Sequence, residues 1–178
     1  MDRERAMEEL NLRIENQDII LHSLAVEAIM RSLARRFHED VDLWGITGLV
    51  HDIDLERVNW NMNIHGMMGG DILEALDFDR TIAYAVRAHN PANNLARRRK
   101  LDKAIYCASP MAKLIAACVE ITPDKSIGNI DTEMIMKCYA DPNFAIDISR
   151  ERIASCSELD LSVEDFSELS LKAVRDVL

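Results

Sequence analysis

The chain lacks several features that mark secreted and membrane proteins. Its 178 residues contain few aromatic side chains, and no apolar run is long enough to cross a membrane. The charged residues 1–5 are not followed by the apolar core of a signal peptide, so we expect a cytoplasmic protein. The four cysteines show neither close pairing nor the spacing of a zinc site, which predicts reduced and mostly buried thiols.

Positive charge is also scarce. The sequence has 21 Lys and Arg residues against 31 Asp and Glu residues, which gives a formal net charge of −10. Because a nucleic-acid backbone requires a basic surface, nucleic acid is not expected as the main partner. A small anionic ligand remains compatible with this composition, since it responds to the local field of its site.

Most of the sequence carries apolar residues with a helical period, and no segment shows the sustained alternation of a strand. We therefore expect an all-α fold of about eight helices in a single domain. Residues 54–63 are polar, and we expect them to form a loop that could cover a pocket. The helical pattern covers residues 3–14, 19–37, 40–52, 64–76, 77–90, 101–121, 131–139, 149–156 and 162–177.

One apolar stretch, Gly48–Asp54, carries a histidine and an aspartate side by side. Neither His51 nor Asp52 is easily buried without a polar partner or a metal ion. Imidazole and carboxylate are also a common ligand set for divalent metals. Three further histidines open or close helical segments, whereas His38 lies in a polar run. These three are His22, His65 and His89.

The order of these residues resembles the HD-domain superfamily of metal-dependent phosphohydrolases, in particular its small stand-alone members. The likeness is close around Leu21–Ala28, Trp44–Asp54, His65–Leu73 and Ala88–Asn90, and it covers roughly residues 1–155. It implies a single HD-domain helical bundle over residues 1–178. A motif-bearing core of about residues 15–120 would carry the site, and the C-terminal helices over 131–178 would pack on this core.

The resemblance also implies a metal centre and a ligand set. His22, His51 and Asp52 would be core ligands, with Asp52 the catalytic carboxylate, and His65 and His89 would serve a second ion. The expected cofactor is one or two divalent transition-metal ions, weakly held or absent if the ligand set is incomplete. Iron, manganese, nickel, cobalt and zinc all suit these ligands.

The sequence departs from the family pattern at the last metal ligand. The family places an aspartate after a run that matches residues 105–108, and this chain has Ser109 there, followed by Pro110. A neutral hydroxyl is a poor substitute for a carboxylate. Asp102 is seven residues earlier, about 10 Å along a helix, and therefore cannot replace it in the same register.

Three other features leave alternatives open. The basic run Arg97, Arg98, Arg99 and Lys100 is either a set of contacts to a substrate phosphate or a solvated loop. Asp54 either forms a hydrogen bond to a ligand histidine or caps the next turn. Lys125 lies in a turn, residues 123–126, that resembles a stretch of the small HD proteins, but the sequence assigns it no chemical role.

Two functions of different class follow. The first is a phosphohydrolase that acts on a small anionic phosphorylated ligand, such as a nucleotide, through a metal-activated water. The second is a catalytically impaired HD module that binds a nucleotide or a protein partner. Ser109 separates the two, because an intact ligand set favours the first and its loss favours the second.

Overall fold

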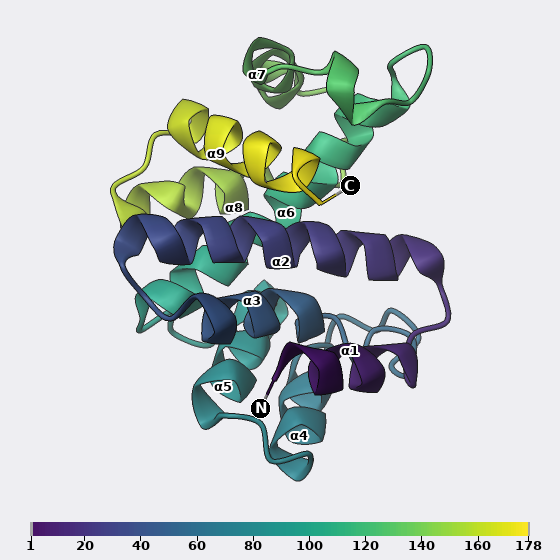
Figure 1. Ribbon diagram of the computed structural model, residues 1–178, viewed down its shortest axis with the longest axis vertical. Coiled ribbons are helices and arrows are strands. Elements are labelled where there is room, and N and C mark those ends of the chain that lie inside the picture. Colours follow the sequence, from purple (N-terminus) through teal and green to yellow (C-terminus); the bar gives the residue numbers. More distant parts are fainter. Residues whose placement is uncertain (1, 178) are drawn as a thin grey trace.

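The computed structural model describes residues 2–177, and within that range it contains nine α-helices, three short 3₁₀-helices and no strand (Figure 1). The all-α prediction is confirmed, and each of the nine ranges with a helical pattern overlaps one α-helix, although the stated number was about eight. The helices are α1 (Arg3–Asn11), α2 (Gln17–Phe37), α3 (Val41–Val50), α4 (Met67–Ala75), α5 (Arg80–His89), α6 (Lys100–Glu120), α7 (Thr132–Ala140), α8 (Arg150–Ala154) and α9 (Val163–Arg175).

The long helix α2 crosses the middle of the molecule (Figure 1). Helices α1, α3, α4 and α5 lie on one side of it, and α7, α8 and α9 lie on the other. Each side has its own apolar cluster. Ile19 and Ile20 of α2 belong to the first cluster, while Val26, Ile29 and the following turns of α2 belong to the second. Helix α2 therefore joins the two clusters, and α6 packs against it.

Helix α3 is buried on nearly all sides, as its apolar content predicts. Every residue from Trp44 to Val50 is buried. Gly48 permits the close approach to α2, because a Cβ atom there would lie 2.9 Å from the backbone of Val26 and Glu27. This packing brings the end of α3, with His51 and Asp52, against the first turns of α2.

The segment between α3 and α4 is a series of turns rather than the start of a helix at residue 64. Gly66 explains the difference, since its φ of +80° is incompatible with an α-helix and α4 begins only at Met67. The predicted helix over 149–156 is likewise shorter. Helix α8 ends at Ala154, and the chain continues in a 3₁₀-helix over Ser155–Leu159.

Helix α6 continues through Pro110, which lacks a backbone N–H. The carbonyl of Tyr106, four residues earlier, therefore receives no helical hydrogen bond. It accepts hydrogen bonds from the Arg152 side chain instead. Among residues 2–177 no helix has both the length and the apolar character that a membrane span requires.

Candidate metal centre

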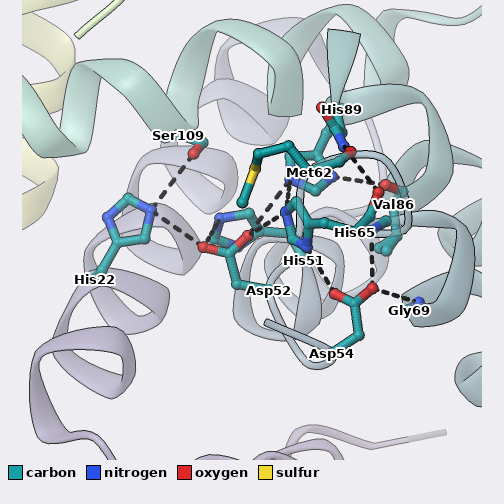
Figure 2. Close-up of polar contacts among 12 residues, drawn as sticks. His22, His51, Asp52, Asp54, Met62, His65, Gly69, Val86, His89 and Ser109 are labelled. Atoms are coloured by element: carbon teal, nitrogen blue, oxygen red, sulfur yellow. Dashed lines mark hydrogen bonds and ion pairs between the residues drawn. The ribbon is translucent and has the colours of Figure 1, made fainter. Parts of the chain in front are cut away.

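Five predicted site residues from separate elements meet at one point (Figure 2). His22 comes from α2, and His51 and Asp52 follow the end of α3. His65 lies in the turns before α4, and His89 is the last residue of α5. Helix ends leave side chains free to project, so three buried helices can supply a compact polar cluster here.

Asp52 lies at the centre of the cluster, with histidines on both sides. Its Oδ2 atom is 3.2 Å from His51 Nε2 and 3.8 Å from His22 Nε2. Its Oδ1 atom is 3.3 Å from His65 Nε2 and 3.4 Å from His89 Nε2. Two groups of three residues could therefore each hold a metal ion, namely His22 with His51 and Asp52, and His65 with His89 and Asp52.

Hydrogen bonds behind three of the imidazoles fix their tautomers. Nδ1 of His51 donates to the carbonyl of Gly48 at 2.7 Å, and Nδ1 of His89 donates to that of Val86 at 2.6 Å. Nδ1 of His65 lies 2.8 Å from Asp54 Oδ1. With the proton on Nδ1, the lone pair of Nε2 faces Asp52, as it does in metal-ligating histidines.

This arrangement fits a divalent metal. His51 Nε2 is buried and makes no hydrogen bond to residues 2–177, although a carboxylate oxygen lies 3.2 Å away. His65 Nε2 and His89 Nε2 are only 3.1 Å apart. A bound cation would relieve the close approach of these nitrogen atoms and would give His51 Nε2 a partner. The nitrogen and oxygen donors match the preference of divalent transition metals.

The surroundings keep most of the imidazoles neutral. Burial, reinforced by neighbouring histidines, lowers the pKa of His22 to about 3. Burial likewise lowers the pKa of His89 to about 4, against the effect of its contact with Asp52. Burial opposes charge on His65 as well, but contacts with Asp52 and Asp54 outweigh it and raise that pKa to about 9.

Asp52 is held in its ionised form. Burial alone would raise its pKa, but the electrostatic interaction with His51 and contacts from His51, His65 and His89 bring that pKa well below its usual range. The cluster therefore combines one ionised carboxylate with neutral imidazoles at His22 and His89, whereas His65 would have to release a proton to bind a metal ion.

Asp54 performs both of the roles considered for it. Its Oδ1 atom accepts from His65 Nδ1, and its Oδ2 atom accepts from the backbone N–H groups of Gly66 and Gly69 at 2.8 Å each. It is fully buried. The carboxylate thus orients His65, a candidate ligand, and also accepts hydrogen bonds from backbone N–H groups at the start of α4 (Figure 2).

Ser109 lies in the cluster, as the comparison with the family pattern predicts. Its hydroxyl is 3.4 Å from His22 Nε2, on the side of the cluster opposite His65 (Figure 2). Asp102 instead accepts hydrogen bonds from the backbone N–H groups of Arg98 and Arg99 at the start of α6. It is therefore occupied as a helix cap and supplies no carboxylate to the metal centre.

The cluster opens into a cavity of about 910 Å³ between α2, α6 and the segment 145–152. His22, His65, His89, Asp52 and Ser109 line its polar end, whereas His51 lies behind them and is fully buried. Apolar walls from α2 and α6, including Leu21, Ala112 and Ala116, continue away from it. Trp60 and Met62, from the loop predicted to cover a pocket, also line the cavity.

The four residues of the basic run do not line this cavity. Arg97 pairs with Glu158 and lies against the Tyr106 ring, and Lys100 pairs with Glu39. Arg98 and Arg99 lie over the ring of Tyr84. The cations that do line the cavity are Lys113, Lys125 and Arg152. Lys125 pairs with Glu120, whereas sequence reasoning gave no signal for Lys113 or Arg152.

Comparison with known proteins gives one match. The family model of the HD domain matches residues 19–117, more than half of the chain and the whole of the candidate metal centre. Arg152 and helices α7 to α9 lie beyond the matched segment. No curated protein and no solved structure matches this sequence.

Proposed function

The chain belongs to the HD-domain family, a superfamily of metal-dependent phosphohydrolases, and we propose that it hydrolyses a small phosphoester. The observation that carries this proposal is the position of Asp52 between two groups of histidines whose Nε2 atoms face its carboxylate. Structural histidines inside a protein make hydrogen bonds to carbonyls and hydroxyls. His51 and His89 use their Nδ1 protons on carbonyls, so their Nε2 lone pairs face the ionised carboxylate, and a bound cation would relieve that repulsion.

His65, His89 and Asp52 would hold one ion, and His22, His51 and Asp52 would hold a second. A bound divalent metal neutralises phosphate oxygens and lowers the pKa of water to near neutrality. Asp52 is the residue that serves both positions. Iron, manganese, nickel, cobalt and zinc are all compatible with this donor set.

The cavity beside the histidine cluster is the proposed substrate-binding pocket. Leu21, Ala112 and Ala116 form apolar walls for the organic part of an ester, while Trp60 and Met62 cover the cavity from the loop side. The volume of about 910 Å³ accommodates a ligand of nucleotide size. We propose a nucleotide, or a phosphoester of similar size, as the substrate.

The test is turnover of phosphomonoesters, phosphodiesters and nucleotides by the purified protein after reconstitution with each metal. We expect phosphate release that chelators abolish and that Asp52→Ala removes. Asp42→Ala is the control, because Asp42 is exposed and pairs only with Arg31. Absence of turnover with every metal and substrate class would contradict the proposal.

Ser109 supports a second candidate function, a catalytically impaired module that binds a nucleotide or a protein partner. The hydroxyl occupies the side of the cluster where the family pattern has a carboxylate. A protein of this kind would bind nucleotides in the same cavity and release no phosphate. Nucleotide binding without turnover, in protein shown to contain metal, would favour this second function.

A further inference from the structure

Two cations, Arg152 and Lys113, line the cavity together with the histidine cluster and form no ion pair with any carboxylate among residues 2–177. The third cation that lines the cavity, Lys125, pairs with Glu120, and Arg97 outside the cavity pairs with Glu158. An unpaired guanidinium is costly to bury unless it serves a ligand. Arg152 and Lys113 are therefore the two cations in the described lining of the cavity that have no carboxylate partner.

Two backbone carbonyls hold Arg152 in place. Its Nη2 atom donates to His89 O at 3.0 Å and to Tyr106 O at 3.1 Å, and its Nε atom donates to Tyr106 O at 3.3 Å. The first carbonyl is at the C-terminal end of α5, and the second is the one that Pro110 leaves without a helical partner. Arg152 also lies against the Tyr106 ring, 4.7 Å from its centroid.

The remaining nitrogen of the guanidinium, Nη1, has no hydrogen-bond partner in the described part of the chain. It is not enclosed by protein either, since it is absent from the buried atoms that lack partners. The guanidinium is thus fixed on one edge and free on the other. Its position beside His89 O places this free group next to the metal centre, and the charge of Asp52 acts on it.

Lys113 complements Arg152 from α6. It is four residues after Ser109, about one turn or 6 Å farther along the helix, and it lines the same cavity. Its charge acts on His22, where it contributes to the lowered pKa of the imidazole. Lys113 is exposed and makes no hydrogen bond to residues 2–177, so its ammonium group is free to reach a ligand.

We propose that Arg152 and Lys113 form an anion subsite beside the metal centre, which binds the phosphate group of the substrate. The proposal rests on the proposed function and identifies the part of the cavity that selects a phosphorylated ligand. A guanidinium with a fixed edge presents its remaining N–H donors to phosphate oxygens at little cost in side-chain entropy. Positive charge here also offsets in part the acidic residues Asp18 and Asp147, which line the same cavity.

The subsite differs from the sequence prediction, which assigned phosphate contacts to residues 97–100. Arg97 lies 4.0 Å from the centroid of the same Tyr106 ring, so both arginines share one structural neighbour. Only Arg152 lines the cavity. Arg97→Gln is therefore the matched control for Arg152→Gln, because it also removes a guanidinium that lies against the Tyr106 ring. Lys103→Gln is the control for Lys113→Gln, because both lysines are on α6 and Lys103 does not line the cavity.

The experiment is calorimetric titration of inorganic phosphate into the metal-reconstituted full chain and, separately, into the chelator-treated chain. Arg152→Gln should weaken phosphate binding by about tenfold or more, the range for a charge-assisted hydrogen bond. Lys113→Gln should weaken it by about two- to fivefold, as for an exposed charge. Arg97→Gln and Lys103→Gln should bind phosphate as the wild type does, and metal content should be unchanged in all four variants.

Arg152→Lys separates phosphate binding from a purely structural role. Lysine keeps the charge and loses the fork, so we expect intermediate phosphate affinity even where the melting temperature falls as far as in Arg152→Gln. Affinity that follows the melting temperature across these variants would overturn the subsite. So would wild-type affinity in both Arg152→Gln and Lys113→Gln, or a wild type that binds no phosphate.

Failure of the subsite and failure of the proposed function are distinguishable. Turnover and metal binding with phosphate affinity independent of Arg152 and Lys113 would remove the subsite and leave the phosphohydrolase. Phosphate binding that depends on Arg152 in a protein that holds no metal would leave the subsite and remove the phosphohydrolase.

Discussion

The two halves of the candidate metal centre are built differently around the shared Asp52. In the half with His65 and His89, each imidazole has a hydrogen-bond acceptor behind it, Asp54 Oδ1 or Val86 O. In the other half, His51 has such an acceptor in Gly48 O, but no residue of the described chain accepts from Nδ1 of His22. Ser109 stands beside His22 where the family pattern has a carboxylate.

The difference shows that the histidines of one ligand set can differ in how firmly hydrogen bonds orient them for metal binding. Acceptors behind an imidazole fix its orientation and increase its basicity, and their loss typically lowers metal affinity by about 10- to 100-fold. A neutral hydroxyl also leaves more of the metal charge uncompensated. We therefore expect the His65–His89 half to hold a metal ion more tightly than the His22–His51 half.

Replacement of Asp52 has the largest expected effect, because both halves depend on its carboxylate. Asp52→Ala should remove retained metal altogether, since four neutral imidazoles would have no anionic ligand to neutralise a dication. Elemental analysis of the reconstituted protein measures this, with helical circular dichroism as a check on the fold. Full metal content in the folded variant would show that the cluster is not the metal centre.

A comparison of single histidine replacements tests the difference between the halves directly. His65→Ala should lose the tightly held ion, whereas His22→Ala should keep it. His65 is oriented by Asp54 and His22 lacks an equivalent acceptor. Metal titrations of both variants, monitored by calorimetry, provide the measurement. The opposite ranking would mean that orientation of the imidazole does not decide affinity here.

Asp54→Asn should weaken metal binding by about 10- to 100-fold, because it removes the anion behind His65. The amide keeps an oxygen for the N–H groups of Gly66 and Gly69, so loss of stability should be modest. Asp79→Asn is the matched control, since Asp79 caps α5 by accepting from Thr81 N and touches no histidine. Equal metal affinity in the two variants would assign Asp54 to helix capping alone.

Ser109→Asp has the smallest expected effect, a gain of affinity in the weaker half. A carboxylate 3.4 Å or less from His22 would supply the anionic ligand that this half lacks. We expect a second tightly held metal equivalent, where the wild type binds its second ion only in excess metal. No increase in bound metal would indicate that orientation of His22, rather than charge, limits this half.

Much of the site follows from local sequence pattern. The apolar setting of His51 and Asp52 predicted their burial, and the ends of predicted helices indicated the other three histidines. The position of Ser109 also followed from matching one run of residues on one helix. Each of these features depends on the residues that surround it in sequence, whereas the assignment of these residues as metal ligands came from the resemblance to the HD-domain superfamily and not from the local pattern.

Arg152 could not be predicted in the same way. Its place depends on carbonyls of His89 and Tyr106, which are 63 and 46 positions away. Tyr106 O is available because Pro110 has no backbone N–H to donate to it. The sequence shows this loss of a helical hydrogen bond, but it does not show that Arg152 becomes the new partner of Tyr106 O. The basic run at 97–100 illustrates the converse, since tertiary contacts with Tyr84, Tyr106 and Glu158 decide where those charges lie.

The most direct test is the metal content of the untagged protein after reconstitution and extensive dialysis. The unequal halves predict about one tightly held divalent ion per chain, with a second bound only in excess metal. Such a result would support a metal centre anchored by His65, His89 and Asp52. A protein that retains no ion under any reconstitution condition would contradict it, and the cavity would then be that of a binding module.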